Sequence, residues 1–217
     1  MENPITPGRT LSRRDLIAGT LIALAMGAVF TTLSSGASLL VTFVPGMAVT
    51  WLVFVRLYVK QTVLPEGAAF LPVFFATLAV QFIHFAEEYT TGFPVKFPVL
   101  YDGAAYSDNL FVIFNMASYF VFTVACLLAF TRKLYFLLIP VMFYIIYGAI
   151  GNAISHTWWS LYLQGYFPGL VTAQLYWIMG PVVLYKLLGE RKAVIAVIAL
   201  FAAVLAPLLT VFTTGRG

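Results

Sequence analysis

Charged side chains are scarce in this chain, and it contains two histidines and a single cysteine. Only 9% of the 217 residues are charged, 62% are hydrophobic and the mean hydropathy is +0.96. Soluble domains carry about 25% charged residues, so the composition excludes an ordinary soluble domain. The single cysteine, Cys126, excludes a disulfide framework and is expected to pack as a small hydrophobic residue. The net charge of +4 requires no nucleic-acid partner, because most basic residues lie in short segments between apolar stretches.

Most of the sequence consists of long apolar runs. A transmembrane helix needs about 20 apolar residues, and seven such segments follow one another, separated by glycine, proline and charged residues. They predict an all-α, polytopic transmembrane bundle with seven spans that forms one domain over residues 1–217. The predicted spans are residues 15–33, 39–59, 69–89, 109–130, 134–161, 169–188 and 193–212.

Basic residues orient this bundle. With seven spans, ten of the 12 Lys and Arg residues lie on one side, and only Lys96 and Arg216 lie on the other. The positive-inside rule then places the N-terminus in the cytoplasm and the C-terminus outside, as expected for a multi-pass protein of the cytoplasmic (inner) membrane. The run Ser12-Arg13-Arg14 is similar to a twin-arginine export signal, but no small-residue cleavage site follows it. We therefore expect residues 15–33 to be a retained first helix.

The most informative motif is His84-Phe85-Ala86-Glu87-Glu88, at the outer end of the third predicted span. Ionisable residues are costly at membrane depth and usually face a protein interior or a wet cavity. At about 100° per residue, Gln81, His84, Glu87 and Glu88 fall within an arc of about 120° on one helix face. His84 and Glu88 are four residues apart, so they can share a proton or a metal ion.

Other spans place polar residues at the same depth. The fifth span carries Asn152 and His156, four residues apart, after small residues that permit close helix approach. The fourth and sixth spans start on the outer side, and their first turns supply Asn115, Ser118, Tyr119, Thr172, Gln174 and Tyr176.

Two outer connections are rich in proline and aromatic residues. Residues 90–108 are predicted to form a lid at the interface, and Ser107 or Asp108 is expected to cap the fourth span. Tyr166-Phe167-Pro168-Gly169 turns the chain, with Pro168 expected in the first turn of the sixth helix.

These motifs resemble the HXXEE domain family of small bacterial and archaeal integral membrane proteins. The resemblance covers residues 70–188 and rests on His84-x-x-Glu87-Glu88, on the downstream His156, and on Tyr166-x-Pro168-Gly169. The family has no assigned function, so the resemblance implies that these residues matter without assigning them a reaction.

Three interpretations of the polar cluster follow from the residue types. In the first, His84, His156 and Glu88 bind a divalent metal, zinc or iron, and Glu87 acts as general base on a water molecule. A dinuclear iron site is disfavoured, because such bundles use four glutamates and two histidines; Asp102 or Asp108 would have to join.

In the second interpretation, a glutamate and His84 perform metal-free acid–base chemistry on a lipid. Aromatic rings expected near the cluster would stabilise a cation: Tyr119, Trp158, Trp159, Tyr176 and Trp177. In the third, the network is structural or binds a ligand without catalysis. A transporter is disfavoured, because the inner halves of the spans offer few polar groups.

The sequence thus favours an enzyme that acts on a lipid-like or isoprenoid substrate drawn from the membrane lipids. Its predicted catalytic groups are His84, Glu87, Glu88 and His156. The residues predicted to orient the substrate are Gln81, Asn115, Tyr119, Asn152 and Tyr166.

Overall fold

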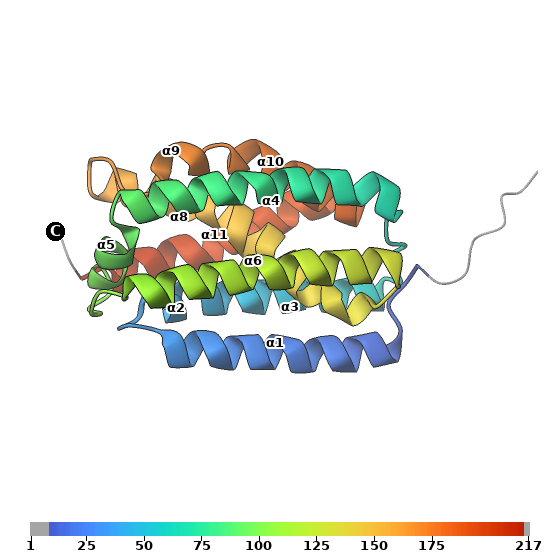
Figure 1. The fold of residues 1–217 in the computed structure, drawn as a ribbon. Coiled ribbons are helices and arrows are strands. Elements are labelled where there is room, and N and C mark those ends of the chain that lie inside the picture. Colours follow the sequence, from blue (N-terminus) through green and yellow to red (C-terminus); the bar gives the residue numbers. More distant parts are fainter. Residues whose placement is uncertain (1–8, 215–217) are drawn as a thin grey trace, which may run out of the picture.

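A computed structural model describes residues 9–214, and every regular element in that range is helical. The long helices run side by side as one elongated bundle (Figure 1). The elements are α1 (Arg13–Leu33), α2 (Ser38–Val41), α3 (Phe43–Val59), α4 (Gly67–Thr90), α5 (Phe93–Val99), α6 (Asp108–Thr131), the 3₁₀ turn η1 (Tyr135–Leu137), α7 (Leu138–Phe143), the π-helical segment η2 (Tyr144–Gly151), α8 (Asn152–Tyr162), α9 (Leu170–Ala173), α10 (Tyr176–Leu188) and α11 (Arg191–Phe212).

Six helical stretches of the described chain are long and apolar enough to cross a membrane, which indicates a multi-pass membrane protein. They are Arg13–Leu33, Ser38–Val59, Gly67–Thr90, Asp108–Thr131, Tyr135–Tyr162 and Arg191–Phe212. The predicted sixth segment is divided into α9 and the shorter apolar helix α10. The prediction of an all-α membrane bundle is confirmed, whereas the count of seven spans stays a prediction.

Local sequence signals set the helix ends. Ser12 caps α1 in a capping box with Asp15, whose other carboxylate oxygen accepts a hydrogen bond from the backbone N–H of Phe136 at 3.1 Å. Ser107 caps α6 as predicted. The expectation for Pro168 was wrong: α9 begins at Leu170 after a left-handed Gly169, so the proline precedes the helix.

The stretch Tyr135–Tyr162 is the centre of the bundle, and residues 138–146 are all buried. Its middle is the π-helical segment η2, a rare geometry that often lies at functional sites. Aromatic rings fix this segment: Phe43 lies 4.3 Å from Tyr147 and Phe122 lies 5.5 Å from Tyr144, centroid to centroid. Cys126 is buried and free beside this core.

The connection between α4 and α6 closes one end of the bundle, where Figure 1 shows α5 across the helix ends. Phe93, Phe97 and Tyr101 are buried in this connection, and the indole N–H of Trp159 donates to the Tyr101 hydroxyl at 2.7 Å. Burial raises the pKa of Tyr101 to about 12, which keeps the phenol neutral. The aromatic connection is therefore a packed cover and not a solvated tether.

Close packing of α3 against η2 depends on Gly46. A Cβ placed there would lie 2.9 Å from Cβ of Tyr147, whereas a Cβ at Gly27 would meet nothing within 4 Å. Overpacking a core costs about 1–3 kcal/mol, while replacing an unhindered helical glycine by alanine gains about 1 kcal/mol. We predict that Gly46→Ala lowers and Gly27→Ala raises the thermal unfolding temperature in detergent. A Gly46→Ala protein as stable as wild type would contradict this packing.

Candidate metal centre

Three buried side chains from two helices meet near the covered end of the bundle. His84 and Glu88 come from successive turns of α4, and His156 comes from α8. Oε1 of Glu88 lies 3.4 Å from Nε2 of His84 and 3.3 Å from Nε2 of His156. One potential ligand atom from each residue lies within 4.8 Å of the other two. The structure thus brings together the three residues that the sequence suggested as metal ligands.

Three of the four imidazole nitrogens of this cluster lack a hydrogen-bond partner among the described residues. Among the described residues, none forms a hydrogen bond with Nε2 of His84 or with either ring nitrogen of His156. A buried polar atom without a partner is costly, so such atoms call for an explanation. Two imidazoles and one carboxylate form a familiar ligand set for catalytic zinc and for non-haem iron. The donor set and its unpartnered nitrogens therefore fit a divalent metal ion.

Thr172 orients the His84 ring. Its hydroxyl lies 2.8 Å from Nδ1 of His84 and also donates a hydrogen bond to Oε2 of Glu87. Because a hydroxyl has one proton, it must accept from His84, which places the imidazole proton on Nδ1. In the neutral form of the ring, Nε2 then carries the lone pair and lies 3.4 Å from Oε1 of Glu88. Partners of this kind commonly fix the tautomer and ring orientation of metal-binding histidines.

Glu87 does not belong to the group of ligand candidates and instead holds the start of α9. Its Oε1 accepts from the Tyr166 hydroxyl at 2.8 Å and from the Val171 N–H at 3.0 Å. Its Oε2 accepts from the N–H of Thr172 at 2.8 Å as well as from the Thr172 hydroxyl. Partial burial and the neighbouring Glu87 carboxylate raise the pKa of Tyr166, so its phenol stays a donor. Within residues 9–214, Glu87 therefore reaches His84 through Thr172 alone, and no contact in that range supports the role of general base.

Gly169 gives the turn before α9 its close approach to the cluster. Its φ is +87°, and a Cβ there would lie 2.6 Å from Cε1 of His156 and 2.9 Å from Cγ of Glu88. Two constraints, backbone conformation and space, thus select glycine at this position. The Tyr166-x-Pro168-Gly169 motif therefore contacts both Glu87 and the metal-ligand candidates.

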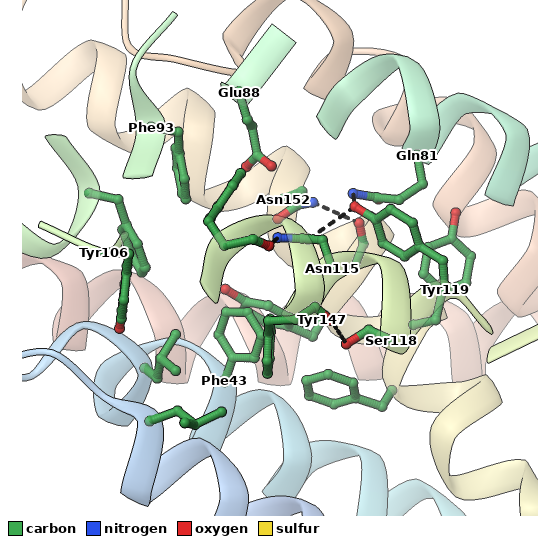
Figure 2. A pocket seen from close by; sticks show the side chains of 18 of the residues that line it. Phe43, Gln81, Glu88, Phe93, Tyr106, Asn115, Ser118, Tyr119, Tyr147 and Asn152 are labelled. Carbon is green, nitrogen blue, oxygen red and sulfur yellow. Dashed lines mark hydrogen bonds between the residues drawn. The ribbon is translucent and has the colours of Figure 1, made fainter. Parts of the chain in front are cut away.

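Four of the five predicted substrate-orienting residues line a cavity that Glu88 also lines (Figure 2). The side-chain N–H of Gln81 donates to the Tyr119 hydroxyl at 3.0 Å, and that hydroxyl donates to Oδ1 of Asn115 at 3.0 Å. Asn152 donates to the carbonyl of Gly148 at 2.9 Å. Tyr166 does not line this cavity; its hydroxyl donates to Glu87 at 2.8 Å, so its expected role beside the substrate lacks a supporting contact.

The aromatic surroundings differ from the expectation. Trp159 and Tyr176 do border the cluster, with ring centroids 5.0 Å from His156 and 5.6 Å from His84. Trp158 instead stacks on Tyr162, and Trp177 binds Thr157. Of these four rings, only the first pair therefore lies beside the cluster. Tyr119, the fifth ring expected there, lines the cavity together with Glu88.

Phe93 was not expected at the site, yet its ring centroid lies 5.5 Å from that of His156. The sequence feature that could have indicated Phe93 is the aromatic composition of residues 90–108.

Asp102 and Asp108 of the same connection are exposed, and the group of potential metal ligands found in residues 9–214 contains His84, Glu88 and His156 without them. A dinuclear site therefore has no support in this arrangement.

Comparisons with known proteins identify no relative: no protein-family model matches the chain, and searches of curated proteins and of solved structures gave no significant match. The interpretation of the site consequently rests on its own geometry.

Gly169 provides a test of the cluster with an internal control. Gly169→Ala and Gly189→Ala both place a side chain at positive φ, but a Cβ at Gly189 meets nothing within 4 Å. A left-handed alanine costs roughly 1–2 kcal/mol, so both variants should unfold at lower temperature. We predict that only Gly169→Ala also loses metal, measured by elemental analysis of the purified protein. Equal metal content in the two variants would contradict the assigned contact.

Thr172 tests the support of His84. Thr172→Val removes the hydroxyl between Glu87 and His84, and loss of such a partner typically weakens metal binding about 10–100-fold. Thr172→Ser retains the hydroxyl and should bind nearly as wild type. Competition with a chromophoric chelator measures both affinities, and an unchanged affinity in Thr172→Val would refute the role of this hydrogen-bond chain.

Proposed function

We propose that this protein is a metal-dependent membrane enzyme that acts on a lipid-like substrate. The observation that carries the proposal is the buried cluster of His84, Glu88 and His156, with ligand atoms within 4.8 Å of one another, beside a cavity that Glu88 lines. The proposal includes seven crossings of the cytoplasmic membrane. The N-terminus then faces the cytoplasm, and the cluster lies in the outer half of the bundle.

The ligand set supports a catalytic more than a structural metal. Structural zinc sites use four protein ligands, whereas catalytic sites use three and keep one position for water or substrate. A divalent zinc or iron ion held here would act as a Lewis acid on a carbonyl or lower the pKa of a water molecule. The two imidazoles would supply neutral ligands, and Glu88 would supply the negative charge that compensates the ion.

A purely structural polar network has less support. A network that locks helices together should satisfy its buried polar atoms. Among the described residues, Nδ1 of His156 has no hydrogen-bond partner, and the two Nε2 atoms have only the Glu88 carboxylate within ion-pair distance, without hydrogen-bond geometry. The cavity wall also carries the hydrogen-bonded chain of Gln81, Tyr119 and Asn115. These groups are suited to orient a polar substrate group.

Membership of the HXXEE domain family forms part of the proposal. It is supported because the residues within 70–188 that carry the resemblance lie close together in space. His84, Glu88 and His156 form the cluster, Glu87 joins it through Thr172, and Gly169 packs against it. In this proposal the family motif describes three metal ligands and the groups that position them.

Metal content tests the function directly. We predict close to one zinc or iron per chain in protein purified without chelators, and at least a tenfold lower content in His84→Ala and in His156→Ala. Gln81→Ala is the matched control, because Gln81 is also buried on α4 and is not a ligand candidate. If wild type and both histidine variants lack metal after incubation with zinc or iron, the metal proposal fails.

Topology is tested separately. With an odd number of crossings and a cytoplasmic N-terminus, alkaline phosphatase fused after Gly217 should be active, and a fluorescent reporter that folds only in the cytoplasm should stay dark. The reverse result would contradict the seven crossings and the outer position of the cluster.

A further inference from the structure

A second pocket lies at the end of the bundle opposite α5, where α4 begins and α6 ends (Figure 1). Its volume is ≈ 260 Å³, whereas one water molecule needs on the order of 10–15 Å³. Three segments that are distant in the sequence line it: Arg9 before α1, the start of α4, and the connection from α6 to η1. The pocket shares no residue with the metal-ligand candidates, so what it binds is independent of the metal centre.

Two cations and one acid line this pocket. Nη1 of Arg9 lies 3.0 Å from Oε1 of Glu66, whose side chain is 75% exposed, so this carboxylate stays in contact with solvent. Nε of the same guanidinium is buried and has no hydrogen-bond partner among the described residues. Lys133 forms no ion pair within residues 9–214. The pocket therefore has an excess of positive charge and a buried donor that lacks an acceptor.

Uncharged donors add to this set. Tyr135 is 6% exposed and lines the pocket, yet its hydroxyl forms no hydrogen bond with a described residue. Glu66 is the N-cap of α4 and makes no side-chain capping hydrogen bond, and the first N–H groups of a helix have no partner within it. Guanidinium, ammonium and helix N-terminal N–H groups all bind phosphate oxygens. The donors of this pocket thus match a phosphate group.

The surrounding contacts fix the pocket and keep further acids out of it. The N–H of Leu64 donates to the carbonyl of Arg9 at 2.8 Å, which holds the segment before α1 beside the start of α4. Asp15 of α1 does not line the pocket, and its carboxylate accepts from the Ser12 hydroxyl and from the Phe136 N–H. Among the described residues, Glu66 is therefore the one acid that would repel a bound anion.

Apolar side chains beside the pocket favour a lipid over a free phosphate ion. Pro65 and Phe130 form an apolar part of its wall. Val63 is 59% exposed, and Leu134, which follows Lys133, is 37% exposed. Both lie next to the ends of helices that are long enough to cross a membrane, where they are placed to contact the glycerol and acyl groups of a lipid. Basic pockets between transmembrane helices at the membrane surface bind anionic head groups. We propose that this pocket binds the phosphate head group of an anionic phospholipid.

Native mass spectrometry of the full-length protein in detergent tests this proposal. Delipidated protein is titrated with phosphatidylglycerol, with phosphatidylcholine that has the same acyl chains, or with inorganic phosphate. The intensities of the free and singly bound species give each dissociation constant. We predict that phosphatidylglycerol binds at least about fivefold more tightly than phosphatidylcholine, whose ammonium group would meet the cations of the pocket. Inorganic phosphate should not bind at the same concentrations, because it lacks the acyl chains.

Lys133→Asn removes one cation of the pocket at a residue whose φ is +57°, a conformation that asparagine tolerates. Its affinity for phosphatidylglycerol should fall about fivefold, the contribution of one Lys or Arg near an anionic head group. The matched control is Lys192→Gln, because Lys192 is exposed at the start of α11 on the same end of the bundle and does not line the pocket. This control should bind as wild type.

Tyr135→Phe removes the unpartnered hydroxyl alone and provides a second variant that keeps the charge of the pocket. Its affinity for phosphatidylglycerol should fall several-fold, because one donor to the phosphate is lost.

Each outcome decides the proposal. Equal affinity for the two lipids overturns it. Equal affinity of Lys133→Asn and Lys192→Gln for phosphatidylglycerol also overturns it, because binding would then reflect general attraction to the basic end of the bundle. If inorganic phosphate binds as tightly as phosphatidylglycerol, the ligand is a free phosphate ion and the lipid proposal fails.

Discussion

The structure depends on the burial of one carboxylate between two imidazoles. Glu88 is 6% exposed and both histidines are fully buried, in a bundle whose other contacts are mostly apolar. An ionised carboxylate in such surroundings is unfavourable unless it is paired or binds a metal ion. No arginine or lysine approaches it within salt-bridge distance in residues 9–214. Compensation must therefore come from the imidazoles or from an ion that they bind, and this requirement organises the surrounding elements.

Those elements position the three candidate ligands and, within residues 9–214, add no further ligand atom to them. The glycine turn before α9 brings the chain against His156 and Glu88, while Glu87 fixes the start of α9 through the N–H groups of Val171 and Thr172. Thr172 then connects Glu87 to His84. On the other side, Phe93 and Trp159 cover His156. Two adjacent glutamates thus have different tasks, since one faces the cluster and the other holds the scaffold around it.

Much of this arrangement could be predicted from the sequence because hydrophobic length and helical periodicity are local signals. Apolar length located the six helical stretches that are long enough to cross a membrane, and four-residue spacing placed His84 and Glu88 together. The predicted segment 169–188 is instead divided into α9 and α10. Three features could not be read in this way. The π-helical segment at Tyr144–Gly151 breaks the 3.6-residue period by which lining residues are assigned. The hydrogen bonds of Glu87 with Val171 and Thr172, and the contact of Thr172 with His84, join residues 84 to 88 positions apart in the sequence. Contacts between residues so far apart in the sequence leave no local pattern.

X-ray absorption at the metal edge of the purified protein tests the central claim most directly, because it reports the atoms around the ion. The account predicts two imidazole nitrogens at about 2.0–2.1 Å and a carboxylate oxygen at about 2.0–2.2 Å, as for zinc bound by two histidines and an acid. The His84→Ala, His156→Ala double variant should bind almost no metal and therefore show almost no absorption edge. A coordination shell without imidazole in the wild-type protein would contradict the claim that this cluster is the metal centre.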